Sequence, residues 1–418
     1  MAGPRVAYIL LWFPEPSQTF ILDEVNTLVR LGLDLTVYTL YGHRSSHLIA
    51  GMGPVAAPVI PLGAPALGAL IKDLLKLGGR WPGGRRFLKR VLIRRWRSLE
   101  TAGEALWATL AGVSLARKFQ ASGIDHIHAP WADGPATAAW VASQLSGIPF
   151  SFCAHAHDIY PPDGALREKL EAASLVRVIS ESNRRHLSAL APGTEAKMVT
   201  IHYGSPLRPR PASPRPGRAP FQLLAMGRLV PKKGCPVLMQ ACRDLMARGV
   251  DFHLTLAGDG PQYSMLSSLV QRYGLKDRVT LTGFVPHRQV PALFHQADLF
   301  IMPCVIDRRG DRDGLPNVIL EAMAHEVPVI ATPVNGIPEA IHPGRTGWLV
   351  PPEDAPALAQ AVLEALGDPA EARRRAKAGW NLVGREFDSQ KNYGQLKICF
   401  QRLAQGEIGP GLGGGLGT

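Results

Sequence analysis

Short apolar runs alternate along the chain with longer segments in which apolar residues recur every three to four positions. The short runs have the length of buried strands, and the longer segments have the period of amphipathic helices. In the first half this predicts strands over 5–13, 34–40, 124–128, 150–154 and 175–179, with helices over 20–31, over 134–145 and from 181. Such alternation indicates a parallel sheet with helices on both faces.

The alternation stops between Pro206 and Pro220, where fifteen residues hold six prolines and four arginines. Proline cannot continue a helix or a central strand, so 206–220 is expected to be an inter-domain linker. Beyond it the pattern restarts, with strands expected over 221–226, 252–257, 279–282, 299–302 and 329–331 and helices over 235–247 and 262–273. The predicted fold class is α/β, with two doubly wound Rossmann-like domains facing across a cleft.

The predicted domains are 1–205 and 221–384, and a helix at about 385–404 is expected to pack back on the first of them. The glycine-rich stretch 406–418 has the composition of a disordered tail. A length of 418 residues suits two domains. The twelve-residue apolar run 105–116 is shorter than the roughly 20 residues of a membrane helix.

The start of the chain has the basic and apolar character of a signal peptide. Pro14-Glu15-Pro16 follows its apolar run instead of a cleavage site, which favours a first buried strand. Five cysteines without a CxxC pair or a metal-binding spacing favour a reducing cytosol. We therefore expect a cytoplasmic protein.

The net charge of +12 is concentrated in one segment. Between Lys72 and Arg97 there are ten lysines and arginines against one acid, Asp73, with Trp and Leu interleaved. This pattern favours a surface helix on anionic lipid, on the inner face of the plasma membrane. A solvated basic face over a core stripe is the alternative. Nucleic acid is not expected as a partner, because no recognisable binding motif accompanies the segment.

A candidate anion site directly follows the expected strand 221–226. Residues 227–234 join that strand to a helix, where free amides and the helix dipole favour a phosphate. Arg228 could grip a diphosphate at two oxygens, and Lys233 would add a point charge. Gly258 and Gly260 follow the next strand and permit a tight turn with close backbone approach, although a structural turn explains them equally well.

Two acids flank the start of another expected helix. Asp313 precedes it and Glu321 is expected about two turns inside it. Carboxylates facing a cleft would accept hydrogen bonds from sugar or ribose hydroxyls. An exposed or ion-paired position is the usual alternative. Asp307, Asp311 and Asp313 also raise a magnesium or calcium hypothesis. The arginines between them would compete with a metal ion.

Histidines gather where strands of the first domain end. His155 and His157 could bind zinc, but no HExxH motif or third ligand accompanies them. A hydrogen bond to a substrate hydroxyl or phosphate is the more natural use of such a histidine. His126 and His128 end another strand, and one of the four is expected to be structural.

Together these segments resemble glycosyltransferase family 4, the retaining GT-B enzymes. The resemblance is carried in the second half by GRLVPKKG, LAGDGP, VTLTGFVP, ADLFIMP, DGLPNVILEAMAHEVPVIAT and NGIPEAI…GWLVPP. In the first half, FPEPSQTFILDEVNTLVRLGLDLTVYTL and HIHAPWADGPATAAWVASQLSGIPFSFCAHAHDIY look like the colanic acid and exopolysaccharide branch. The resemblance spans roughly residues 5–400.

The resemblance implies a role for each matching residue. Arg228 and Lys233 would hold the donor diphosphate, Glu321 the ribose, and Asp313, which stands where the family has Glu, the sugar hydroxyls. The implied donor contacts are Gly227, Gly258, Gly260, Phe284, Val285, Gly314, Leu315, Pro316 and Asn317. On the side of the first domain they are His155, which would contact the sugar, and the acceptor-side residues Ser17, Thr19, His157 and Asp158.

The implied activity is transfer of a hexose from a nucleoside-diphosphate sugar to a saccharide or lipid-linked acceptor, with retention and no essential metal or other cofactor. A dinucleotide-dependent oxidoreductase would need GxGxxG after the first strand, where Phe13-Pro14-Glu15-Pro16 stands instead. A silent sugar- or membrane-binding GT-B protein, a GT-B epimerase and a phosphorylase remain as alternatives.

Overall fold

The computed structural model describes residues 3–15, 18–42, 52–63, 68, 71–72, 84–92, 98–160, 165–205 and 218–406. Its residues group into two compact units, 1–202 with 389–418 and 203–388. The expected linker 206–220 lies outside the described residues up to 217, and the expected tail does so from 407. Each unit is built on a parallel sheet, as the alternating pattern predicted.

Among the described residues of the first unit, seven parallel strands pair in the order β3-β2-β1-β4-β5-β6-β7. They are β1 (Arg5–Trp12), β2 (Asp34–Gly42), β3 (Val59–Pro61), β4 (His126–Ala129), β5 (Phe150–Ala154), β6 (Leu175–Val178) and β7 (Met198–Thr200). The helices are α1 (Thr19–Arg30), α4 (Gly84–Leu92), α5 (Leu99–Ser122), α6 (Gly134–Ser146), α7 (Ala156–Ile159), α8 (Leu166–Ala172), α9 (Glu181–Leu190) and α17 (Ser389–Ala404).

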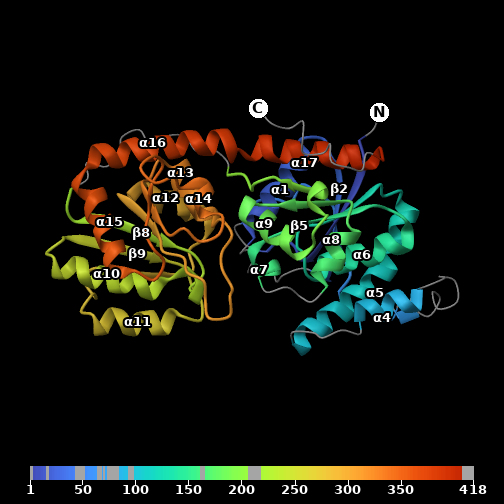
Figure 1. Ribbon diagram of the computed structural model, residues 1–418, viewed down its shortest axis with the longest axis horizontal. Helices are drawn as coiled ribbons and strands as arrows, with labels where there is room; N and C mark the ends of the chain where they lie inside the picture. The colour runs from blue at the N-terminus through green and yellow to red at the C-terminus, as the bar shows by residue number, and fades with distance from the viewer. Residues whose placement is uncertain are drawn as a thin grey trace. The chain divides into compact units, whose positions relative to one another are not determined.

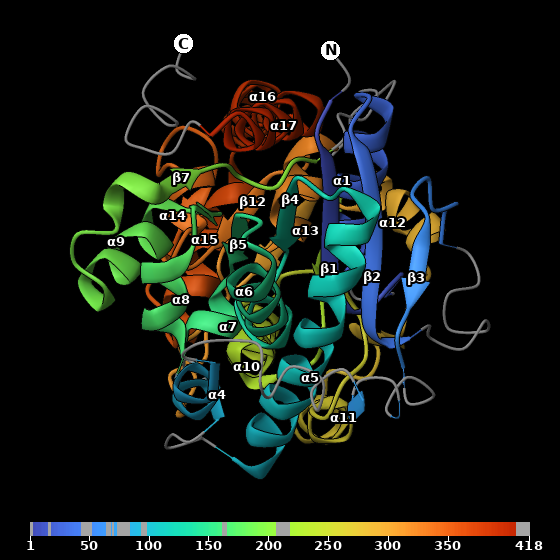
Figure 2. The same ribbon diagram turned by 90° about the vertical axis from the view of Figure 1, so that its right-hand side faces the viewer.

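Alternation of side chains along β1 divides the first unit into two layers. Ala7 and Ile9 belong to the apolar core that α5 and α6 cover, whereas Tyr8 donates to Glu24 of α1 and meets the Phe400 ring of α17. Figure 2 shows α6 lying over β4 and β5, which it contacts. The apolar run 105–116 lies within α5 and packs on α6. The last helix, α17, contacts α1 and β4, so the chain ends on the sheet where it began.

Six parallel strands make the sheet described in the second unit, in the order β10-β9-β8-β11-β12-β13. They are β8 (Phe221–Met226), β9 (Phe252–Ala257), β10 (Val279–Gly283), β11 (Leu299–Met302), β12 (Val329–Ala331) and β13 (Trp348–Leu349). The helices are α10 (Cys235–Ala247), α11 (Tyr263–Arg272), α12 (Val290–Gln296), α13 (Asn317–Ala324), α14 (Ile337–Ala340), α15 (Ala355–Gly367) and α16 (Pro369–Glu386).

Two apolar clusters sandwich this second sheet. One joins it to α10, α11 and α15, and the other joins it to α12, α13, α14 and α16 (Figure 1). In both sheets the order reverses beside the first strand, at β1–β4 and at β8–β11. Ligands of such folds bind outside the carboxyl ends of the strands at this switch point. The predicted patterns missed β3, β7 and β13, which are two or three residues long and lack a readable period.

Candidate functional site

The loop after β8 is locked against the loop after β9 by backbone contacts. Leu229 donates its amide to the Asp259 carbonyl at 2.9 Å, and Gly227 donates to Ala257 at 3.0 Å. Gly258 has φ +140°, and a Cβ there would stand 1.9 Å from the Gly227 oxygen. Two adjacent strand ends therefore come this close only because the residue between them has no side chain.

The same loop also meets the end of β11 across the switch point. Gly234 lies in the left-handed region at φ +67°, and a Cβ on it would stand 1.8 Å from the Pro303 carbonyl oxygen. The amide of Val305 donates to the Lys232 carbonyl at 2.9 Å. The short 3-10 turn Pro231–Lys233 and the start of α10 are thereby fixed beside the loop that leads to α13.

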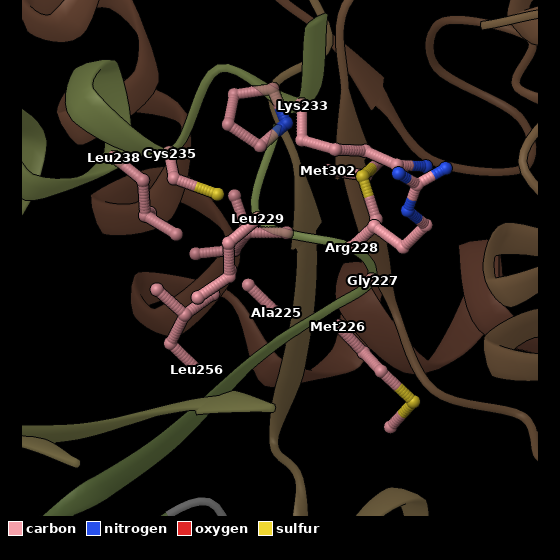
Figure 3. Close-up of a pocket in the computed structure, with 12 residues that line it drawn as sticks. Ala225, Met226, Gly227, Arg228, Leu229, Lys233, Cys235, Leu238, Leu256 and Met302 are labelled. Atoms are coloured by element: carbon pink, nitrogen blue, oxygen red, sulfur yellow. The ribbon is translucent and has the colours of Figure 1, made fainter. Parts of the chain in front are cut away.

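Arg228 and Lys233 extend to the same side of this loop, away from Leu229 and Leu238, which point into the domain (Figure 3). Arg228 is exposed, and within the part of the chain that the structure describes it forms no ion pair. Both side chains line a shallow recess together with the apolar side chains of Ala225, Leu238 and Met302.

Lys233 is paired with a predicted site residue from 80 positions further along the chain. Its Nζ lies 2.7 Å from Asp313 Oδ2, and Lys232 Nζ lies 3.6 Å from Asp313 Oδ1 and 3.1 Å from Asp311 Oδ1. The Cys304 thiol donates to Asp313 Oδ2 at 3.5 Å. The structure thus brings together two of the predicted residues, Lys233 and Asp313, and adds Lys232 and Cys304 to them.

Charge pairing controls the ionisation of this cluster. Burial disfavours both charged forms, but the Asp313 carboxylate outweighs it and raises the pKa of Lys233 above its ordinary value. In turn the two lysines outweigh burial and hold the pKa of Asp313 below its ordinary value. Both groups are therefore charged at neutral pH. Burial raises the pKa of Cys304, so it is a neutral thiol that can donate.

The remaining predicted donor residues line the entrance to α13. Asn335 donates its side-chain amide to the Asp313 carbonyl at 3.2 Å, and Gly336 donates to Gly314 at 3.2 Å. Leu315 and Pro316 follow in the same loop. Asn317 is the first residue of α13, so Glu321 lies one turn inside that helix and not about two, and it is partly buried. Phe284, after β10, is 67% exposed, whereas Val285 packs on the core.

No group of three or more His, Cys, Asp or Glu side chains that could hold a metal ion occurs among the residues the structure describes. Asp307 accepts the amides of Arg309 and Asp311 at 2.8 and 2.9 Å. Asp311 and Asp313 face lysines. These contacts favour ion pairing for Asp311 and Asp313, and backbone hydrogen bonding for Asp307, over metal binding.

In the first unit, His155 follows β5, and its ring lies beside the Trp131 ring after β4 and the Phe20 ring of α1. Its ring centroid is 4.1 Å from that of Trp131 and 6.0 Å from that of Phe20. The carboxylate of Asp158 accepts the amides of His155 at 2.7 Å and Ala132 at 2.6 Å. Asp158 is buried and holds two loops together.

Burial alone would lower the pKa of His155. The Cys153 sulfur and the Asp158 carboxylate outweigh it and raise that pKa above its ordinary value. A protonated imidazole against an indole face is a favourable cation–π arrangement. His157 is exposed, Thr19 is the first residue of α1 and partly buried, and Ser17 lies outside the described residues.

His126 and His128 are buried and share the Ser151 hydroxyl, at 2.6 and 2.7 Å. Burial lowers the pKa of His126 to about 3 and that of His128 well below its ordinary value, so both rings are neutral. They also contact the Phe400 ring of α17. These two histidines therefore act structurally, whereas the sequence predicts one structural histidine among the four.

The pattern did not single out Lys232, Cys304, Trp131 or Phe20. The first three lie in segments that follow strands, and Phe20 lies in the first turn of α1. A weak signal was available, since Lys232 and Lys233 are consecutive. Lys169 was also missed. It is fully buried and donates to the Ala132 carbonyl at 2.6 Å and the Asp133 carbonyl at 3.0 Å, which fixes the Trp131 loop.

Much of the basic segment Lys72–Arg97 lies outside the described residues. In α4, Val91 is fully buried and Phe87 packs edge-on against Trp140 at 5.0 Å, while Lys89 is exposed. Phe87 and Val91 of α4 therefore pack on the core, which is compatible with a core stripe beneath a solvated basic face. Within the described residues, no helix has the length and apolar character needed to cross a membrane.

The family described as Glycosyl transferases group 1 matches residues 220–368. "Putative colanic acid biosynthesis glycosyltransferase WcaL" of Salmonella typhimurium is 28% identical over 374 residues, 86% of this chain and 90% of that protein. The Escherichia coli protein of the same name is 42% identical over 196 residues, 46% of this chain and 48% of that protein. The amylovoran biosynthesis glycosyltransferase AmsK of Erwinia amylovora is 35% identical over 185 residues, and this alignment too spans about half of each protein.

Among solved structures, Anabaena HepE in complex with UDP and glucose superposes with a TM-score of 0.69 at 19% identity, covering 94% of this chain and 98% of that one. A sucrose-phosphate synthase from Thermosynechococcus elongatus superposes with a TM-score of 0.70 at 21% identity, covering 96% and 100%. At these identities the likeness establishes the fold and no more.

Proposed function

Because this chain belongs to the GT-B glycosyltransferases of the group 1 family, in the colanic acid and exopolysaccharide branch, we propose that it transfers a hexose from a nucleoside-diphosphate sugar to a saccharide or lipid-linked acceptor, with retention. The observation that carries the proposal is the pair Arg228 and Lys233. Both extend to one side of a loop fixed by two neighbouring strand ends, directly before α10.

Departure of the nucleoside diphosphate is the difficult event, because negative charge builds on its phosphates. Fixed cations and helix-end amides aimed at that charge are the largest aid a protein can supply. In this proposal Arg228 grips the diphosphate and Lys233 stabilises the leaving charge. The departing phosphate accepts the proton of the acceptor hydroxyl, so no protein general base is needed. Because the hydroxyl attacks an oxocarbenium-like ion pair from the face that the leaving group departs, no protein nucleophile is needed either.

Other residues take their proposed roles from the resemblance. Glu321 holds the ribose, Asp313 accepts hydrogen bonds from hydroxyls of the transferred sugar, and His155 donates to that sugar. The amides of 314–317 stabilise sugar and phosphate, and the backbone of Phe284 and Val285 meets the base. A role for Glu321 is compatible with its partly buried position one turn inside α13.

Release of nucleoside diphosphate from UDP-, GDP-, ADP- and TDP-sugars, with and without oligosaccharide acceptors, tests the activity. Arg228→Ala and Lys233→Ala should each lower turnover by about 10²–10³. Lys276→Ala removes an exposed lysine of the same unit and serves as the matched control. Near-normal turnover in both site variants would remove the proposed role of Arg228 and Lys233. A product whose anomeric configuration is inverted relative to the donor would rule out retention.

For the partner surface we propose an electrostatic contact between Lys72–Arg97 and anionic lipid at the inner face of the plasma membrane. The exposed Lys72 and Lys89 support charge attraction, while the buried Val91 and the partly buried Phe87, which packs on the core, argue against insertion of these two side chains. Sedimentation with phosphatidylglycerol vesicles should occur at low salt and disappear near 0.5 M salt, because exposed charges are screened at about that concentration. Binding that persists at high salt would indicate insertion instead.

A further inference from the structure

The lysine proposed to bind phosphate is already engaged by a carboxylate of its own chain. Asp313 Oδ2 lies 2.7 Å from Lys233 Nζ, and only 15% of the Asp313 side chain and 14% of the Lys233 side chain are exposed. At that distance and burial the carboxylate cancels much of the field that the ammonium would offer to an anion. Lys233 therefore does not act as an independent positive charge.

The neighbouring lysine is neutralised in the same way. Lys232 Nζ lies 3.1 Å from Asp311 and 3.6 Å from Asp313. The two lysines and two aspartates form a cluster with no formal net charge. Arg228 differs from them, since it is exposed and makes no ion pair within the described residues. A diphosphate that enters the site can therefore pair with the exposed Arg228 directly, whereas Lys233 is already paired with Asp313.

We propose that Asp313 is an internal counter-ion that competes with the donor diphosphate for Lys233, and that the displaced carboxylate then accepts hydrogen bonds from the transferred hexose. This inference rests on the proposed function and assigns the site a preference. It favours an intact sugar donor over the nucleoside diphosphate that is left after transfer.

The preference follows from the hydrogen bonds that each ligand offers to the displaced Asp313 carboxylate. Both ligands must draw Lys233 away from Asp313, or accept its repulsion at close range. A sugar-bearing donor restores hydrogen bonds to the carboxylate, whereas a bare nucleoside diphosphate leaves it buried without a partner of equal strength. The product is therefore bound less well, and its release, a step that limits turnover in many enzymes, is helped.

Isothermal titration calorimetry with UDP, GDP, ADP and TDP tests this. For the nucleotide that binds the wild type, Asp313→Asn should bind about tenfold tighter, because a charge repulsion worth tenfold in affinity has been removed. Asp313→Glu keeps the charge and should stay within about threefold of the wild type. Asp311→Asn, which leaves Lys233 paired, is the matched control and should stay within about twofold. Equal or weaker nucleotide binding by Asp313→Asn would overturn the inference.

A second readout separates this role from a structural one. The affinity for the matching nucleotide sugar, divided by that for the nucleotide, should fall at least about tenfold in Asp313→Asn. The affinity for the nucleotide rises, while the sugar of the donor loses its contact with the carboxylate. An unchanged ratio would overturn the inference even if both affinities moved. If neither the wild type nor any variant binds one of the four nucleotides or turns over one of the corresponding nucleotide sugars, the proposed function fails. If the wild type does so but Asp313→Asn binds the same nucleotide no tighter, only the counter-ion role of Asp313 fails.

Discussion

The strongest stability prediction concerns a buried ion pair that spans the first unit. Glu24 on α1 and Arg177 on β6 are both completely buried and in direct contact. The Arg177 guanidinium also donates to the carbonyls of Ile201 at 2.9 Å and His202 at 3.2 Å. Its guanidinium lies 5.8 Å from the Tyr393 ring centre on α17. Removing Glu24 would leave a charge deep in the sheet with its main counter-ion gone.

We expect Glu24→Leu to lower the free energy of unfolding by about 3–5 kcal/mol, the usual cost of leaving one member of a buried pair unpaired. For a unit of this size, each kcal/mol lowers the melting temperature by about 2–4 °C, so a fall of roughly 6–20 °C is predicted. The double variant with Arg177→Met should recover most of the loss, because two apolar side chains replace two desolvated charges. The two carbonyls freed of Arg177 keep the recovery incomplete.

Differential scanning calorimetry on the wild type, the single and the double variant measures these differences. Glu171→Gln is the matched control, since it breaks an exposed pair with Arg167 in the same unit and should cost less than about 1 kcal/mol. The reasoning is refuted if Glu24→Leu costs no more than this control. It is also refuted if the double variant is no more stable than the single one, because desolvation of an unpaired charge would then not be the cause.

Three further outcomes can be checked. Gly258→Ala should weaken nucleoside-diphosphate binding about tenfold or more by calorimetry, because its Cβ would stand 1.9 Å from the Gly227 oxygen; unchanged affinity would contradict this. Since burial lowers the pKa of His126 to about 3, its neutral form stabilises the fold above about pH 6.5, and this contribution is lost as the pH falls from about 6.5 towards 3. The urea midpoint should therefore drop between pH 7 and pH 5, and less steeply in His126→Gln; an equal slope would be evidence against it. Glu326→Gly should raise the free energy of unfolding by about 0.5–1 kcal/mol, and with it the urea midpoint, because Glu326 sits at φ +58°. A lower midpoint would show that its side chain matters more than its backbone.

Local pattern was sufficient to predict the long helices and strands and the loop 227–234. The strand at 221–226, the glycines at 227 and 234 and the helix from 235 are consecutive in sequence, so their geometry follows from local rules. The same holds for Asp313 before α13. The misjudged features are those whose local signal is short, such as β13, or depends on a helix boundary, such as the depth of Glu321 in α13.

Charges inside apolar segments were a signal that pattern alone could not interpret. Glu24 interrupts the apolar face of α1, and Arg177 stands within a strand of otherwise apolar residues. Each is costly by itself, and only their pairing across 153 positions makes both acceptable. Sequence spacing does not report such a pairing, because it is set by the order of strands in the sheet.

Local patterns along the chain were enough to predict two β-α alternations, a cationic loop after the first strand of the second one, and acids before a later helix. Which of these features meet in space depends on the three-dimensional fold. The strand order β8–β11 places the Lys233 ammonium on the Asp313 carboxylate, and the order β1–β4–β5 gathers Phe20, Trp131 and His155. Periodicity reflects burial along one element, whereas contacts between distant elements follow from how sheets are ordered and packed, and that information is not local.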